Sequence, residues 1–287
     1  MGQARVNGVT LECRSNGSGE SVFLVHGSAS DYRTWRFQEE VLAADFNVIC
    51  YSRRYHWPNA EIASGAVYSM TEHVDDLEAL IRDLDAAPAH LVGHSYGAFL
   101  CLLLAIREPG LVRTLVLAEP PVITLFVSPR PRPSELLRLL VIRPRTAAVI
   151  IGFGAAGIGP ATKAFQAGDA EAGLRRFARA VFGRGGYDSL PESRRAQVRD
   201  NLSNVEAEIL GPGLAPLNAL DLQKLQLPVL LVTGESSVKL FQRLTDALEE
   251  LLPRASRVQI PAASHMMHED NAPAFNRAVR SFLAANA

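Results

Sequence analysis

The sequence has little charge imbalance, little cysteine and no long apolar run. Its 29 Lys and Arg residues nearly balance 30 Asp and Glu residues, so the formal net charge is −1. Without an excess of basic residues the chain has little attraction for phosphate backbones, so nucleic acid is not an expected partner. The hydrophobic share of 48% and the charged share of 21% are those of a globular protein. A chain of 287 residues buries a large core without disulfide or metal staples.

The cysteine content and the apolar stretches also bear on the expected cellular location of the protein. Cys13, Cys50 and Cys101 are odd in number and show no C-x-x-C spacing, which predicts reduced core residues in a cytoplasmic protein. The N-terminal residues have no apolar stretch typical of a signal peptide. The longest weakly polar stretch, 147–161, is too short and too rich in glycine to span a bilayer. We therefore expect a cytoplasmic protein without a membrane partner; its oligomeric state cannot be predicted.

Short apolar runs alternate with longer amphipathic stretches in two separate parts of the chain. Strands are predicted at 22–25, 46–51, 90–93, 111–118, 228–233 and 257–260, and helices at 34–44, 71–86, 96–107, 238–252 and 272–285. The turn from Val6 to Val9 predicts an opening β-hairpin. This order indicates an α/β protein with a mostly parallel central sheet flanked by helices.

Residues 121–215 differ from both flanking parts. They contain no clear strand, they begin with many Pro and Arg residues, and they continue as helix-like stretches. We predict an inserted helical cap at 121–215, between a first core part at 1–120 and a second at 216–287. Five arginines near its start are predicted to be solvated rather than to select an anionic substrate: Arg130, Arg132, Arg138, Arg143 and Arg145.

The chemical motif is Gly93-His94-Ser95-Tyr96-Gly97, which follows a predicted strand and opens a predicted helix. This is the G-x-S-x-G nucleophile elbow in its expected context. The serine of such an elbow sits in a strained turn, where side chains on the flanking positions would collide with neighbouring backbone. Ser95 is therefore the predicted nucleophile, and the amide of Tyr96 lies beside it.

On these motifs the chain resembles the α/β-hydrolase superfamily over residues 1–120 and 216–287. His26-Gly27 after a strand, with Trp35 downstream, is similar to the family's oxyanion loop, which implies that the amides of Ser28 and Tyr96 form the oxyanion hole. The ending from Ala263 to Phe275 resembles the family's final motif, with His265 in the position of the catalytic base. His268 falls out of register and is expected to meet solvent or a hydrogen-bond partner.

The acid has two candidates. Most of the family places it in a G-x-x-D turn after the strand at 228–233, but here Ser237 occupies that position and cannot stabilise an imidazolium. Glu119, after the preceding strand, is similar to the acid of a minority that includes lactone hydrolases of the zearalenone type. Glu119 is favoured as the acid and Glu235 is the alternative.

The resemblance implies a serine hydrolase that cleaves a small carboxylic ester or lactone through an acyl-enzyme on Ser95. The same triad serves carbon–carbon bond hydrolases, thioesterases and cofactor-free perhydrolases or oxygenases, and the fold also serves small-molecule sensors and could act as an inactive binding module. No metal-ligand spacing is present, and the G-x-G-x-x-G match at 152–157 lies outside any βαβ unit, so no cofactor is expected. The predicted pocket residues are Trp57, His94, Phe126 and Phe153.

Overall fold

A computed structural model describes residues 2–63, 65–183 and 185–287 and contains one eight-stranded sheet. The strand order is β1-β2-β4-β3-β5-β6-β7-β8, with β1 and β2 forming the predicted antiparallel hairpin and β3 to β8 running parallel. The fold class is as predicted. The strands are β1 (Gly2–Val6), β2 (Val9–Asn16), β3 (Ser21–Val25), β4 (Asn47–Tyr51), β5 (Ala89–His94), β6 (Val112–Ala118), β7 (Val229–Gly234) and β8 (Ala255–Ile260).

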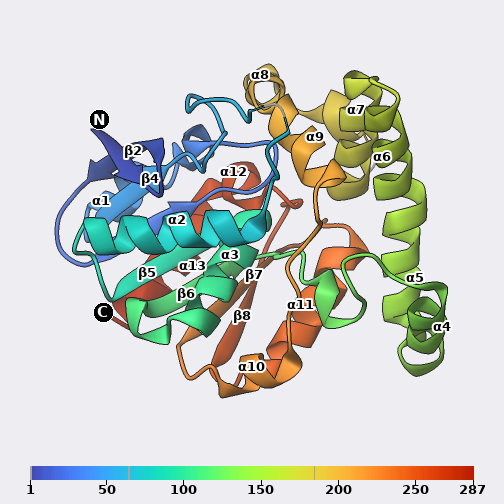
Figure 1. Cartoon of the computed structure of the whole chain (residues 1–287). Coiled ribbons are helices and arrows are strands. Elements are labelled where there is room, and N and C mark those ends of the chain that lie inside the picture. The colour runs from blue at the N-terminus through green and yellow to red at the C-terminus, as the bar shows by residue number, and fades with distance from the viewer. Residues whose placement is uncertain (1, 64, 184) are drawn as a thin grey trace.

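Helices cover both faces of the sheet (Figure 1). Along β3, Phe23 and Val25 join the cluster under α2, α3 and α11, whereas Val22 and Leu24 join the cluster under α1 and α13. Successive side chains of a strand point to opposite faces, so a strand covered on both faces reads as a continuous apolar run. These helices are α1 (Glu39–Ala43), α2 (Met70–Asp83), α3 (Tyr96–Arg107), α10 (Ala219–Lys224), α11 (Lys239–Leu251), α12 (Met267–Asp270) and α13 (Ala272–Ala284).

The predicted helix at 34–44 is shorter in the structure. Tyr32–Trp35 forms a 3₁₀ turn and α1 begins only at Glu39. Gln38, between them, is buried and its amide nitrogen donates to the His268 carbonyl and the Asn276 side chain. The segment is therefore shaped by its contacts with the C-terminal helices rather than by its own periodicity.

The remaining helices form a separate layer along the top and right of Figure 1, and all lie within residues 121–215. Its core includes Phe165, Leu174, Phe177 and Val181, which pack together with Phe241 of α11. The helices are α4 (Pro133–Ile142), α5 (Pro144–Phe153), α6 (Gly159–Gln166), α7 (Ala170–Phe182), α8 (Glu192–Asp200) and α9 (Leu202–Leu210). A π-helical turn, Gly154–Ile158, joins α5 to α6.

Together α5, this turn and α6 make one continuous helix, Pro144–Gln166. Among the described residues it is the one helix that has the length and composition to cross a membrane, judged on those two properties alone, so the expectation that this stretch is too short to span a bilayer is wrong. Only 22% of its most apolar window is buried.

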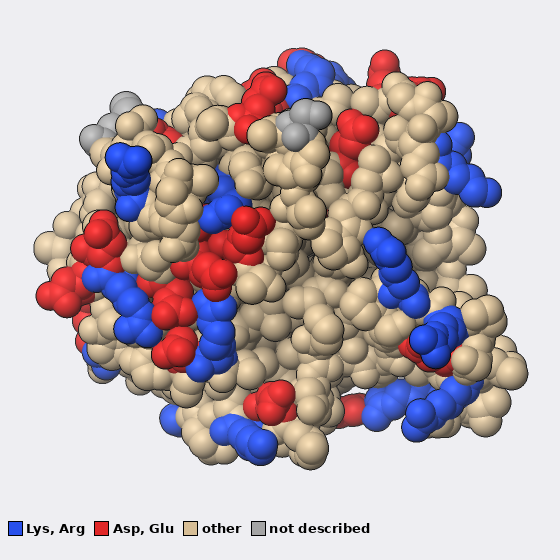
Figure 2. All heavy atoms as spheres, viewed as in Figure 1, with Lys and Arg blue, Asp and Glu red and all other residues tan. Residues whose placement is uncertain are grey.

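The charged side chains and the cysteines are distributed as in other globular proteins. Figure 2 shows acidic and basic side chains interspersed on one face. Arg82 and Arg107 both form ion pairs with Glu78. Cys13, Cys50 and Cys101 are buried and free, which confirms that they are core residues.

Candidate active site

The elbow between β5 and α3 has the backbone that the glycine spacing predicts. Ser95 has a φ of 51°, in the left-handed region that residues with a side chain rarely adopt. A Cβ on Gly93 would lie 2.4 Å from the Ala98 Cα, and one on Gly97 would lie 2.2 Å from the Val25 carbonyl oxygen. Only glycine fits at these two positions, so the tight turn at Ser95 requires both of its flanking glycines.

The carboxylate that reaches the predicted base belongs to Glu119. Glu119 follows β6, is completely buried, and its Oε2 accepts a hydrogen bond from His265 Nδ1 at 2.6 Å. Ser237, which stands where most of the family has its acid, donates its hydroxyl to the same Oε2 at 2.9 Å. Glu235 is exposed and accepts the Ala262 amide instead. The structure therefore brings Glu119, and not Glu235, to His265.

His265 is held on three sides in the loop between β8 and α12. The Phe241 ring stacks on its imidazole at 3.9 Å, and the His94 ring lies at 4.7 Å. His94 Nε2 also donates to the His265 carbonyl oxygen at 2.8 Å. His265 Nε2 is buried and has no hydrogen-bond partner in the described part of the chain, Ser95 included. This leaves one nitrogen engaged by Glu119 and the other free to take a proton.

Burial sets the charge states of this pair. It lowers the pKa of His265, which keeps the imidazole neutral, as a general base must be at neutral pH. It raises the pKa of Glu119 to about 8, while hydrogen bonds from the Ser237 hydroxyl and the Gly234 amide act in the opposite direction. The two donors thus favour the carboxylate, the form that can stabilise an imidazolium.

The loop His26-Gly27-Ser28 lies directly against the elbow. A Cβ on Gly27 would be 3.0 Å from the Ser95 Cβ, so a side chain there would press on the nucleophile. The buried guanidinium of Arg53 donates to the Gly27 carbonyl at 3.0 Å and to the His26 carbonyl at 3.2 Å. The Arg53 amide donates to His26 Nε2 at 2.9 Å, so His26 and Arg53 together hold this loop.

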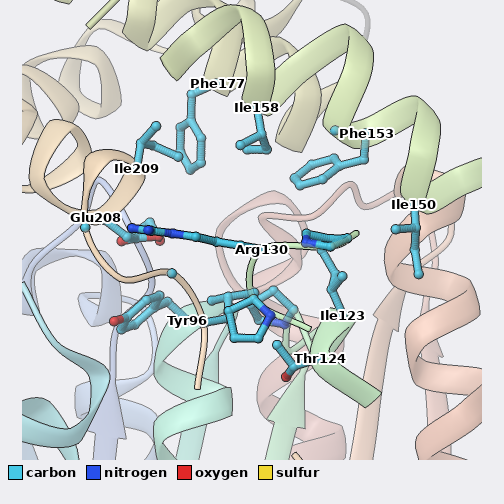
Figure 3. A pocket seen from close by; sticks show the side chains of 18 of the residues that line it. Tyr96, Ile123, Thr124, Arg130, Ile150, Phe153, Ile158, Phe177, Glu208 and Ile209 are labelled. Atoms are coloured by element: carbon cyan, nitrogen blue, oxygen red, sulfur yellow. The ribbon is translucent and has the colours of Figure 1, made fainter. Parts of the chain in front are cut away.

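A cavity of about 520 Å³ opens between the elbow and the cap (Figure 3). Ser28, Ser95 and Tyr96 line it from the core side, and Phe153 lines it from the cap as expected. Several further lining residues are not predicted from the sequence: Tyr68, Ile123, Ile150, Ile158, Phe177, Glu208 and Ile209. Those on cap helices lie at helix-like apolar positions, but periodicity alone does not distinguish a pocket face from a packing face. No sequence signal marked Glu208.

Three predicted pocket residues do not line this cavity. The Trp57 ring instead stacks on Tyr32 and lies under the Arg33 guanidinium at 3.8 Å. His94 turns behind the elbow to the loop of His265, because neighbouring residues of a strand point to opposite faces. Phe126 packs against the core cluster beneath the cap. The predictions for Trp57, His94 and Phe126 are therefore wrong.

The remaining candidates have structural surroundings. His268 is buried, and its Nε2 lies 2.8 Å from the Thr34 hydroxyl, within hydrogen-bonding distance. Within the described ranges, no group of three or more His, Cys, Asp or Glu side chains is placed to hold a metal ion. The G-x-G-x-x-G match lies inside the continuous cap helix, where a Cβ on Gly157 would meet the Ala180 Cβ at 2.3 Å. That glycine serves close helix packing.

The mostly parallel sheet, the elbow and the buried acid–histidine pair define an α/β hydrolase. The profile of the alpha/beta hydrolase family matches residues 22–278, and the chain belongs to this family. A 2-(acetamidomethylene)succinate hydrolase from Mesorhizobium japonicum is 27% identical, over 96% of this chain and 92% of its own length. In two other curated relatives the matched region spans only 44% and 37% of the relative's length.

Solved structures share the same fold. An esterase from Thermogutta terrifontis has a TM-score of 0.76 at 21% identity, with 99% of each chain covered. An enol-lactonase from Burkholderia xenovorans LB400 has a TM-score of 0.75 at 20% identity, covering 99% of this chain and 100% of its own.

Proposed function

We propose that this hydrolase cleaves a small carboxylic ester or lactone through an acyl-enzyme on Ser95. The observation that carries the proposal is the buried contact between His265 and Glu119 beside the strained Ser95 turn. Such an arrangement supplies a nucleophile, a base and an orienting acid at one sheet edge. The three residues come from three separate turns, after β5, β6 and β8.

In the proposed reaction the Ser95 hydroxyl oxygen attacks the substrate carbonyl carbon, and its proton moves to His265 Nε2. Glu119 accepts a hydrogen bond from the Nδ1–H of His265 and stabilises the imidazolium that forms. The amides of Ser28 and Tyr96 donate to the developing oxyanion, each contributing roughly 3 kcal/mol at the transition state. His265 then gives its proton to the leaving oxygen. A water molecule, activated by the same imidazole, hydrolyses the acyl-enzyme and regenerates Ser95.

The pocket supports an ester or lactone with a mostly apolar acyl group. Aliphatic and aromatic side chains dominate its lining, with Phe153, Ile158 and Phe177 on the cap side in Figure 3. A serine at the elbow argues against epoxide or alkyl halide hydrolysis, for which the family uses an aspartate. The structural neighbours include an esterase and an enol-lactonase, and also meta-cleavage product hydrolases, so an ester or lactone substrate is compatible with them but rests on the pocket.

A panel of p-nitrophenyl esters, lactones and thioesters tests the proposal. We expect the highest kcat/KM on short or medium esters or on lactones, and Ser95→Ala should lower it by a factor on the order of 10⁶. A carbon–carbon bond hydrolase or a sensor of the same fold would bind without turning over any member of the panel. Turnover that survives in Ser95→Ala would show that the nucleophile is another residue.

A further inference from the structure

One acidic side chain in the pocket has no part in the reaction described above. Glu208 belongs to α9, the last helix of the cap, and lines the same cavity as Ser95 and Tyr96. In Figure 3 it lies on the same side of the pocket as Tyr96. It is the one acidic residue among the described lining residues, and Arg130 is the one basic residue. The remainder of the lining is apolar or uncharged.

The contacts of Glu208 place its carboxyl group next to the oxyanion loop. The Ser28 hydroxyl donates to Glu208 Oε1 at 2.6 Å, although 180 residues separate the two in sequence. Because the proposed oxyanion hole uses the Ser28 amide, this contact puts the carboxyl group close to the position of the substrate carbonyl. A group on the first carbons of the acyl chain would therefore come within reach of Glu208.

The carboxyl group is only partly satisfied by the protein. Glu208 Oε2 is enclosed and has no hydrogen-bond partner in the described part of the chain. The Arg53 charge acts on Glu208, but each nitrogen of that guanidinium already has a partner: the His26 carbonyl, the Gly27 carbonyl or the Tyr68 hydroxyl. Arg130 is exposed to solvent. An enclosed acceptor without a donor is unfavourable, and a bound ligand can supply the missing donor.

Burial raises the pKa of Glu208 to about 7, opposed by the hydrogen bond from Ser28 and by the charge of Arg53. A carboxylate is therefore present in a substantial fraction of molecules at neutral pH. A carboxylate beside an oxyanion hole disfavours the negative transition state unless a donor group lies between the two charges. A plain alkyl acyl chain offers no such group, whereas a hydroxylated one does.

We infer that Glu208 selects substrates whose acyl group carries a hydroxyl close to the scissile carbonyl, by accepting a hydrogen bond from that hydroxyl. This inference rests on the proposed function, since it concerns the acyl side of the same pocket. The substrate class becomes a hydroxyacyl ester, or a lactone with a ring hydroxyl near its carbonyl carbon.

Binding to a Ser95→Ala protein tests the inference without requiring turnover. Ethyl butyrate and ethyl 3-hydroxybutyrate differ by one hydroxyl, and their Kd values can be measured by NMR titration. We expect the hydroxylated ester to bind about 10- to 100-fold more tightly, as a hydrogen bond to a charged acceptor implies. Adding Glu208→Leu should bring the two Kd values together, mainly by weakening the hydroxylated ester. Adding the isosteric Glu208→Gln instead should reduce the preference to an intermediate value, and both variants are checked by thermal unfolding.

Two control variants distinguish recognition of the substrate hydroxyl by Glu208 from support of the oxyanion loop by the same residue. Ser28→Ala removes the hydroxyl that bonds Glu208 but keeps the backbone amide, and the preference for the hydroxylated ester should persist. Arg130→Gln removes the other charged lining residue, and the preference should again persist. Equal Kd values in the parent Ser95→Ala protein would overturn the inference. So would a preference that survives Glu208→Leu, or one that Ser28→Ala removes as completely.

Kinetics distinguish failure of the inference from failure of the proposed function. If wild-type protein hydrolyses the matched p-nitrophenyl esters with equal kcat/KM, the proposed function holds and the role of Glu208 is wrong. If neither ester is hydrolysed but the Kd preference depends on Glu208, the recognition site stands and the proposed reaction is wrong.

Discussion

The core and the cap of this protein differ in how tightly the sequence determines them. In the core, strands β3 and β5 to β7 are buried along nearly their whole length, and the elbow glycines admit no side chain. In the cap, α4 leaves large apolar residues exposed, with Val141 76% and Leu137 64% exposed. The core supplies the reacting groups, and the cap supplies most of the apolar wall of the pocket. In the proposed function the chemistry is therefore encoded in the tightly packed part and the substrate choice in the more permissive one.

The proposed acid, Glu119, gives the largest expected effect within the core. Glu119→Gln keeps the size of the side chain but cannot stabilise the imidazolium on His265, so kcat should fall by about 10³- to 10⁴-fold. Glu235→Gln is the matched control, because Glu235 is exposed and its carboxylate accepts a hydrogen bond from the Ala262 amide rather than from His265. It should change kcat by less than about twofold. Steady-state kinetics on a p-nitrophenyl ester measure both, and a reversal of the two effects would assign the acid to Glu235.

Two glycine substitutions compare the packing of the core and the cap directly. Gly97→Ala places a Cβ 2.2 Å from the Val25 carbonyl oxygen, so the free energy of unfolding should fall by about 3 kcal/mol. Gly152→Ala lies in the cap helix with nothing within 4 Å of the new Cβ. It should raise the free energy of unfolding by about 0.5–1 kcal/mol, since alanine favours the helix.

Urea unfolding followed by circular dichroism measures both changes. If Gly97→Ala were as stable as the wild type, the elbow would be looser than the contacts of Gly97 indicate, and the contrast between core and cap would be lost.

Ser237→Ala tests a smaller effect in the core, on the carboxyl group of Glu119. It removes the hydroxyl that donates to Glu119 Oε2, so the pKa of Glu119 should rise further above about 8. The Glu119–His265 pair is inactive when Glu119 is protonated. The rise of kcat/KM with increasing pH should therefore move to higher pH by about one unit. Activity lost at pH 7 should return at higher pH. A loss of equal size at every pH would mean that Ser237 acts only on the structure of the loop.

Much of the site follows from the sequence because the parallel sheet brings the ends of β5, β6 and β8 to one edge. Ser95 is marked by the glycines around it, and Glu119 by the serine that replaces the usual acid at 237. His265 is marked by its place after the last strand. Each signal is local and depends on backbone that tolerates little variation.

The pocket wall does not follow from the sequence in the same way. Trp57 is aromatic and close to a strand end, yet Tyr32 and Arg33 hold its ring outside the cavity. In the sequence, Glu208 looks like any charged residue on an amphipathic helix. Its place in the pocket depends on how α9 packs over the oxyanion loop. Which face of a cap helix meets the pocket depends on how helices from distant parts of the chain pack together, and helical periodicity does not specify that arrangement.

Covalent labelling with a fluorophosphonate probe, followed by peptide mass spectrometry, tests the central claim most directly. In the proposed mechanism Ser95 lines the pocket and is activated by His265, so we expect a single adduct on the peptide that contains Ser95. Labelling should slow by about 10³-fold in Glu119→Gln and remain unchanged in Glu235→Gln. An adduct on a different residue, or ester turnover in a protein that the probe leaves unmodified, would contradict the account.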